Sequence, residues 1–200
     1  MEKIVITGTG TVNSTGLSVA ESWQNVANGV SGVGKITLFD TTDWNVTIAC
    51  ELKGFDPARY MDAKDARRRD RYEQLAVAAA KEALTQSGLE ITDANRARTG
   101  VIVSSAIGGM KSLQDAIVTM KNEGPRRVSP FLIPMLMPNG AAGLIAIDYG
   151  IHGPSFSLSS ACASGADGIG MAWMMLRAGM IDSAVTGAAE ATEKLGPLIP

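Results

Sequence analysis

The sequence predicts an α/β fold in which helices cover a largely parallel sheet. Short apolar runs bounded by glycine or small residues are typical of buried strands, and they occur at Ile4–Thr7, Val101–Ser105 and Ser183–Gly187. Long helical patterns separate these strands, above all Asp65–Ser87 and Ser164–Arg177. Strands that alternate with helices indicate a layered α/β domain. The 200 residues contain no repeat or linker and suit one domain.

The N-terminal part is expected to hold one helix and one short strand. Ser18 is a typical N-cap for a helix over Val19–Asn28, and Gly29 ends it. A glycine-rich loop then covers Gly29–Asp43, and Val46–Leu52 alternates like a strand.

The second half continues the alternation of helices and strands. Helices are expected over Leu113–Asn122 and Asn139–Tyr149. Ser129–Pro138 is apolar but interrupted by prolines, which predicts an extended, packed loop. The alternation through Ser155–Leu158 predicts a strand.

Composition and charge argue against several classes of function. The chain is 46% hydrophobic and 19% charged with a formal net charge of -2, which is typical of a globular protein and argues against nucleic acid as a partner. No apolar run approaches the roughly 20 residues needed to span a membrane. The N-terminus runs straight into a strand, so we expect no targeting peptide and a cytoplasmic location. Cys50, Cys162 and the single histidine, His152, form no ligand cluster, so neither a metal nor another cofactor is expected.

Cys162 is the strongest candidate for chemistry. It lies between the expected strand Ser155–Leu158 and a helix, where unpaired N–H groups and the helix dipole favour a thiolate. The same N–H groups suit a developing oxyanion, and the small flanking residues leave room for a substrate carbonyl. The alternative is a small buried hydrophobic residue, and it describes Cys50, inside an alternating strand, well. For Cys162, residue chemistry alone leaves both interpretations open.

Other short motifs fail as binding or catalytic signatures. Gly8-Thr9-Gly10 lacks the third glycine of a dinucleotide-binding turn, because Asn13 stands there, and no helix follows at once. Residues 109–112 lack the Gly-Lys pair of a phosphate-binding loop. Ser164 lacks the G-x-S-x-G context of a nucleophile and is expected to belong to the start of the helix.

The turn Ser160–Gly165 is the strongest of several segments that together resemble one family. The others are Ile4–Gly10, Gly32–Asp40, Phe55–Pro57, Arg67–Arg71, Ala106–Gly109, Arg127–Phe131 and Thr186–Ala191. In this order they resemble the N-terminal half of the β-ketoacyl-acyl-carrier-protein synthases, condensing enzymes of the thiolase fold, and the type II enzymes most closely. The resemblance implies a thiolase-like, layered α/β/α unit with a mostly parallel mixed sheet over residues 1–192. This unit would be one half of the usual two-half fold, followed by a divergent tail at 193–200.

The resemblance also implies roles for individual residues. Cys162 would take an acyl group from carrier-protein phosphopantetheine as a thioester, and its backbone N–H would contribute to the oxyanion hole. The carbanion from decarboxylating malonyl-carrier protein would then attack this acyl-enzyme. Ile107 corresponds to the residue that lines the acyl tunnel, and Leu132 and Ile133 to the loop that closes it across a homodimer interface. As plain packing residues, these three would look the same from sequence.

A basic patch for the acidic acyl-carrier protein is the second implied feature. It consists of Lys64, Arg67, Arg68, Arg126 and Arg127. Such a patch steers an acidic partner even on a net-acidic protein. The alternative is a solvated helix face whose charges pair with nearby aspartates.

The chain departs from the family pattern in what it lacks. The family places its two catalytic histidines, a supporting lysine and a gating phenylalanine in the C-terminal half, and His152 matches a turn instead. Asn139-Gly140 is a smaller departure, because a larger residue commonly follows the asparagine. We therefore expect a reactive thiol but poor condensation by the chain as it stands. Two alternatives stay open, a non-catalytic subunit that pairs with a C-terminal half or a full synthase, and a polyketide-type ketosynthase.

Overall fold

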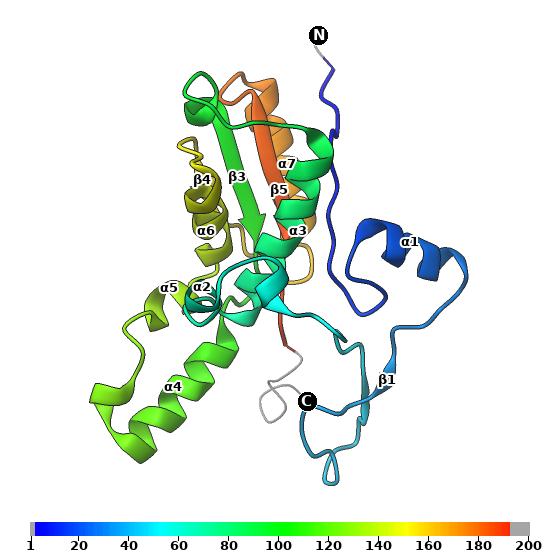
Figure 1. Ribbon diagram of the computed structural model, residues 1–200, viewed down its shortest axis with the longest axis vertical. Helices are drawn as coiled ribbons and strands as arrows, with labels where there is room; N and C mark the ends of the chain where they lie inside the picture. The colour runs from blue at the N-terminus through cyan, green and yellow to red at the C-terminus, as the bar shows by residue number, and fades with distance from the viewer. Residues whose placement is uncertain (1–2, 193–200) are drawn as a thin grey trace.

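The computed structural model describes residues 3–192, and its three-stranded sheet is parallel. The central strand β3 (Thr99–Ser104) lies between β4 (Ser155–Phe156) and β5 (Ser183–Ala188), as Figure 1 shows. The register pairs the first residue of β3 with the first of β5 and continues through all six residues of each strand. Because the strands are parallel, their carboxyl ends meet at one edge of the sheet. The predicted α/β class is confirmed.

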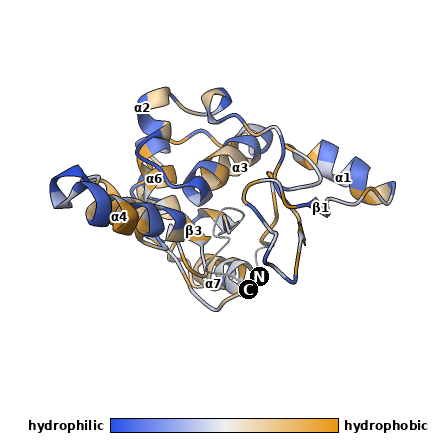
Figure 2. Cartoon of the chain, turned by 90° about the horizontal axis from the view of Figure 1, so that it is seen from below, coloured by the Kyte–Doolittle hydropathy of each residue, from blue (hydrophilic) through white to orange (hydrophobic). Residues whose placement is uncertain are grey.

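Helices cover both faces of this sheet. The helices α3 (Arg71–Ser87) and α6 (Gly140–Tyr149) lie on one face, and α7 (Ser164–Arg177) lies on the other (Figure 2). Side chains of β3 alternate accordingly. Val101 joins the buried cluster formed with α3 and α6, whereas Ile102 joins the cluster formed with α7. All six residues of β3 are buried, as expected for a strand covered on both faces.

The remaining elements lie outside these layers or connect them. They are α1 (Val19–Ala27), β1 (Gly34–Lys35), β2 (Ile48–Ala49), α2 (Ala63–Ala66), α4 (Met110–Glu123) and α5 (Leu132–Leu136), with 3-10 turns at Pro57–Arg59, Arg96–Arg98 and Pro125–Arg127. The cap predicted at Ser18 is confirmed, since its side chain accepts a hydrogen bond from the Glu21 N–H at 3.2 Å. The helices expected at 113–122, 139–149 and 164–177 are also present.

The strand predicted at Ile4–Thr7 is wrong. This segment is extended but pairs with no described strand, and Val5 and Ile6 are 68% and 84% exposed. The chain that follows it packs on α3 instead. The Thr9 N–H donates to Gln86 Oε1 at 2.6 Å, and a Cβ on Gly10 would lie 1.9 Å from the Ala79 carbonyl oxygen. The glycines of this motif therefore permit close contact with a helix rather than with a phosphate.

The single helix predicted over Asp65–Ser87 is interrupted. Asp70 adopts an extended backbone conformation and caps α3 with a complete capping box, in which Glu73 accepts from the Asp70 N–H at 2.7 Å. The sequence did not reveal this break, because the segments on both sides of it, α2 and α3, are helical and the charged residues continue across it. Gly88 ends α3 in the left-handed conformation, as predicted.

Three other expectations need correction. Ser129–Pro138 is not wholly extended, because α5 forms within it; Pro134 lies in the first turn of this helix, where no intrahelical N–H is required. The strand predicted over Val46–Leu52 shortens to β2, which pairs only with β1. Cys50 lies just beyond β2 and is exposed, so the buried interpretation was wrong. The predicted tail at 193–200 lies outside the described residues.

A buried acidic side chain joins α3 to the start of α6. Glu73 is fully buried, and its Oε1 atom has no hydrogen-bond partner. A Cβ on Gly140 would lie 2.1 Å from this oxygen and 2.7 Å from the Tyr72 hydroxyl oxygen, so only glycine leaves room for both side chains. Burial raises the pKa of Glu73 to about 8. The hydrogen bond from the Asp70 N–H lowers this pKa, whereas the negative charge of the Asp70 carboxylate raises it further.

Among residues 3–192, no helix combines the length and the apolar character needed to cross a bilayer.

We predict that Glu73→Gln raises the free energy of unfolding at pH 8 by roughly 1–3 kcal/mol. The folded-state pKa of about 8 exceeds the ordinary value of 4.5, so between these pH values the folded protein holds a proton that the unfolded chain has lost. Stability therefore falls as pH rises through this window and levels off above it. Urea unfolding from pH 4.5 to pH 8 measures the slope, which the variant should flatten.

The matched control is Glu90→Gln, an exposed carboxylate that undergoes the same change. It should leave the slope unchanged. An unaltered pH dependence in Glu73→Gln would show that the buried carboxyl does not hold the proton.

Candidate active site

Cys162 lies in a tight turn between β4 and α7, as predicted. The preceding residue, Ala161, has a φ of 52° and is the only non-glycine residue with positive φ among residues 3–192. This conformation costs an L-residue roughly 1–2 kcal/mol, so surrounding contacts must hold it. Cys162 is exposed at the end of the turn. Ala163, the N-cap of α7, directly follows it.

Ser164 holds this turn in place. Its side chain is buried, its Oγ accepts from the Ser160 N–H at 2.9 Å, and it donates to the Ala161 carbonyl oxygen at 2.7 Å. The Ser164 hydroxyl therefore bonds to the backbone just before Ala161 and to the carbonyl of Ala161 itself. It is the first residue of α7 and supports the turn, which confirms its predicted position at the start of the helix.

Two glycines of α7 allow the helix to approach the sheet closely. A Cβ on Gly168 would lie 2.8 Å from Ser104 Oγ, and one on Gly165 would lie 3.0 Å from Ala188 Cβ. These contacts explain a composition that is otherwise unfavourable in a helix. Gly170 differs, because nothing lies within 4 Å of the position of its Cβ.

Ile107 occupies the turn between β3 and α4 at the same edge of the sheet. It is 39% exposed. The neighbouring Gly109 N–H donates to the Leu136 carbonyl oxygen at 3.0 Å, so this turn packs on the C-terminal end of α5. Leu132 is half-buried and Ile133 is 59% exposed on that helix. The structure thus brings the turn of Ile107 and α5 together.

The turns of Ile107 and Cys162 are also connected. The Ser159 hydroxyl donates to the Ser105 carbonyl oxygen at 2.9 Å. Because Ser105 directly follows β3 and Ser159 shortly precedes Cys162, this bond joins the two turns across the sheet edge.

A groove of about 490 Å³ runs beside the Cys162 turn. Residues 158–160 form one side of it, and residues 166–174 of α7 form the other. Its lining is mainly apolar, with Trp173 and Met174 half-exposed, and Asp167 adds a carboxylate in the first turn of α7. The Ser160 hydroxyl donates to this carboxylate.

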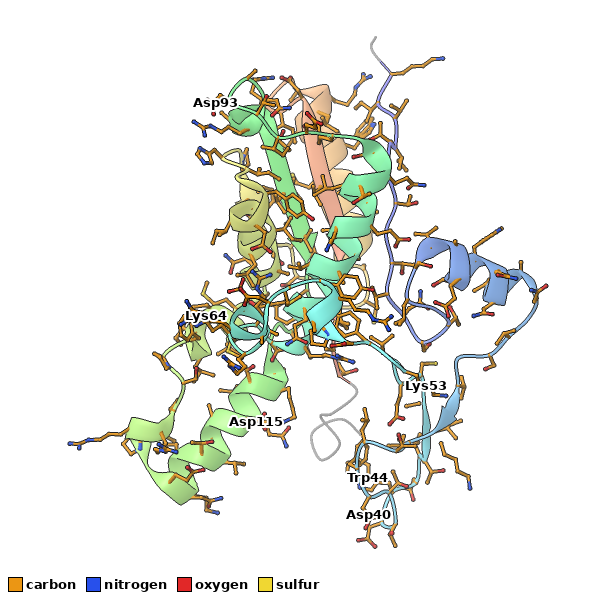
Figure 3. The ribbon with its side chains drawn as sticks, viewed as in Figure 1. Asp40, Trp44, Lys53, Lys64, Asp93 and Asp115 are labelled. Carbon is orange, nitrogen blue, oxygen red and sulfur yellow. The ribbon has the colours of Figure 1, made fainter. Side chains whose placement is uncertain are left out.

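The five basic residues fall into two groups. Lys64, Arg67 and Arg68 lie in or directly after α2, where Figure 3 labels Lys64. The Arg68 guanidinium stacks on the Phe131 ring at 4.4 Å, which ties this group to the start of α5. The other two lie in the turn Pro125–Arg127 beyond α4, where Arg127 pairs with Glu123 at 3.5 Å.

His152 is remote from Cys162. It lies in an exposed turn after α6, and its N–H donates to the Arg96 carbonyl oxygen at 2.8 Å. Arg96 pairs with Asp93, which Figure 3 places at the end of the molecule where β3 begins. Because Cys162 follows the opposite ends of the strands, His152 is not its base.

Two residues at this edge, Ser105 and Glu190, were not predicted from the sequence, and the Ser105 hydroxyl donates to Glu190 Oε1 at 2.8 Å. Both lie within segments that carried the family resemblance or adjoin one, yet neither was given a role. Glu190 lies two residues after β5, and a lone carboxylate after a predicted parallel strand is a signal that could have singled it out.

Comparisons with known proteins agree on one family. The sequence profile of the beta-ketoacyl synthase N-terminal domain matches residues 1–198. A 3-oxoacyl-[acyl-carrier-protein] synthase 2 from Staphylococcus aureus (strain N315) is 42% identical over 95% of this chain and 46% of its own length. The chain therefore spans about half the length of the curated relative that it matches.

Solved structures share the fold. The ishigamide ketosynthase/chain length factor has a TM-score of 0.82 at 28% identity and covers 98% of this chain and 51% of its own. A type II polyketide ketosynthase solved in complex with its acyl-carrier protein has a TM-score of 0.80 at 22% identity. The match covers 96% of this chain and 54% of the solved one. These are thiolase-fold ketosynthases, which confirms the thiolase-like fold expected from the sequence.

We predict that Ser164→Ala destabilises the protein by about 1–3 kcal/mol, because the Ser160 N–H and the Ala161 carbonyl lose their partner. Thermal unfolding by circular dichroism measures the loss. Ser164→Thr keeps the hydroxyl and should recover most of the stability, and Ser155→Ala, an exposed position on β4, should change it little. Equal stability of Ser164→Ala and the wild type would mean that other contacts hold Ala161.

Proposed function

The chain belongs to the β-ketoacyl synthase family, and we propose that it carries the acyl-loading part of a 3-oxoacyl-[acyl-carrier-protein] synthase of fatty-acid elongation. The observation that carries the proposal is the exposed Cys162 in a strained turn directly ahead of α7. The thiolate would attack the acyl thioester of the carrier protein, forming the Cys162 S–C bond as the phosphopantetheine thiol leaves. The backbone N–H of Cys162 would donate to the oxyanion.

Acyl-carrier protein is the proposed partner. One basic group lies at α2, where Arg68 contacts Phe131 at the start of α5, and the other lies in the turn Pro125–Arg127. Both would meet the acidic surface of the carrier protein. The solved neighbour that includes a carrier protein supports the choice of partner class. The acyl chain would enter between the turn of Ile107 and α5, where Leu132 and Ile133 lie.

Condensation needs groups that the sequence does not supply near Cys162. The one histidine, His152, lies at the other end of the sheet. Loading of Cys162 and slow or absent condensation is therefore the proposed behaviour of residues 1–200 alone. The family resemblance assigns the catalytic histidines to a C-terminal half, and a homodimer and a cytoplasmic location complete the proposal.

The fatty-acid substrate class is favoured over the polyketide class. Identity to the fatty-acid relative is 42%, against 28% to the ishigamide ketosynthase. Retention of Cys162 favours a catalytic chain over a non-catalytic partner subunit.

We predict that an acyl-phosphopantetheine thioester acylates Cys162 at least about 10-fold faster than Cys50, because only Cys162 lies at a helix N-terminus. Both thiols are exposed, so accessibility alone does not separate them. Intact mass followed by peptide mapping measures the two rates.

The matched controls are Cys50→Ser, which should load normally, and Cys162→Ser, which should not. Equal labelling of the two cysteines would overturn the activated-thiol proposal. Formation of a 3-oxoacyl product after addition of malonyl-carrier protein would show that residues 1–200 suffice for condensation.

We predict that reversing charge at α2 weakens carrier-protein binding. Arg67→Glu with Arg68→Glu should raise the Kd about 10-fold or more at low ionic strength, with a smaller effect at high salt. Lys81→Glu, an exposed change on α3, is the matched control. Calorimetric titration at two salt concentrations measures both effects, and equal affinities for the two variants would contradict a docking role.

A further inference from the structure

Ser105 is the centre of a hydrogen-bond network at the carboxyl edge of the sheet. Its side chain is fully buried directly after β3. Its N–H donates to Ser157 Oγ at 3.2 Å, its carbonyl accepts from Ser159 Oγ at 2.9 Å, and its Oγ accepts from the Gly108 N–H at 2.8 Å. One residue thus contacts the end of β4, the start of the Cys162 turn and the turn of Ile107.

Glu190 completes this network from the third strand. The Ala189 N–H donates to the Ser104 carbonyl oxygen at 3.0 Å, which carries the pairing of β5 with β3 one step further. Glu190 follows at once, and its Oε1 accepts from Ser105 Oγ at 2.8 Å and from the Ala106 N–H. A single carboxylate oxygen therefore fixes the hydroxyl of Ser105 and the backbone that leads to Ile107.

The direction of these bonds makes Glu190 necessary for the others. A hydroxyl has one proton to donate. Because Glu190 accepts the Ser105 proton, the lone pairs of Oγ face the Gly108 N–H. Without Glu190 the Ser105 hydroxyl can rotate, which weakens its bond with the Gly108 N–H. The Ala106 N–H also loses its acceptor, so the turn of Ile107 loses two of its hydrogen bonds. Charge-assisted bonds of this kind are stronger than neutral ones.

We propose that Glu190 is a positioning residue that sets the turn of Ile107 against the turn of Cys162. Ser105 connects the two turns, because its carbonyl accepts from Ser159 on one side and its hydroxyl donates to Glu190 on the other. The inference rests on the proposed function, because it assigns to Glu190 control over which acyl chains Cys162 accepts. Small displacements at a reacting centre have large kinetic effects.

The first experiment measures loading of Cys162 with hexanoyl and dodecanoyl thioesters of N-acetylcysteamine on the full chain. Glu190→Ala should change the ratio of the two second-order rates by about 10-fold, with Cys162 as the site of both adducts. Glu190→Gln keeps an acceptor oxygen and should restore most of the wild-type ratio. Glu90→Gln and Glu90→Ala, exposed changes before the amino end of β3, should leave it unchanged. A wild-type ratio in Glu190→Ala, with normal loading, overturns the positioning role and leaves the proposed nucleophile intact.

The second experiment needs no catalysis. Hydrogen exchange followed by mass spectrometry should show faster exchange in Glu190→Ala both at residues 106–108 and at residues 159–163, with the α3 peptides unchanged. Faster exchange confined to 106–108 would overturn the coupling between the turns. If no variant loads Cys162 at all, the proposed function fails, and this exchange pattern still decides whether Glu190 positions the two turns.

Discussion

The burial of β3 between two parallel neighbours is the constraint on which the rest of the structure depends. All six of its residues are buried, and they pair with β5 along their whole length and with β4 near the middle. Parallel pairing fixes where each connection must emerge, so the chain after β3, β4 and β5 leaves from one edge. Ile107, Cys162 and Glu190 are thereby neighbours at that edge although they are far apart in sequence.

The sheet brings the turns that follow its strands close together, and hydrogen bonds then hold these turns in place. Serines directly follow β3 and β4, at Ser105 and Ser157, and the hydroxyls of Ser157, Ser159 and Ser164 bond to the backbone of adjacent turns. The same logic explains the departure at Asn139-Gly140. Glu73 of α3 reaches the start of α6, and its carboxyl lies where a side chain at residue 140 would be. The glycine and the buried acid therefore depend on one another, and neither is explained without the other.

Sequence patterns predicted the layered core well because its signals are local. Gly88 ends α3 and the apolar run of β3 is unambiguous, and an equally local signal identified Ser18 as the cap of α1 outside the core. The failures arose where the outcome depends on a distant partner. Ile4–Thr7 has the composition of a strand but no described strand to pair with, and Cys50 follows a strand of only two residues that lies outside the core. The Cys162 turn was predicted from its small residues, whereas Glu190 acts only through contacts made across the sheet edge.

If the proposed function is correct, the geometry of the site separates acyl loading from condensation. In the proposed loading step, the accessible thiol, the fixed turn and the backbone donor for the oxyanion would all come from residues 159–164. Condensation also requires stabilisation of charge on the malonyl group, and the one histidine of the chain is held at the opposite end of the sheet by its contact with Arg96. The thiol is therefore positioned independently of the groups that would complete a turnover. Under the proposed function, a turn that Ser164 holds in place would let Cys162 take an acyl chain without contact with those groups.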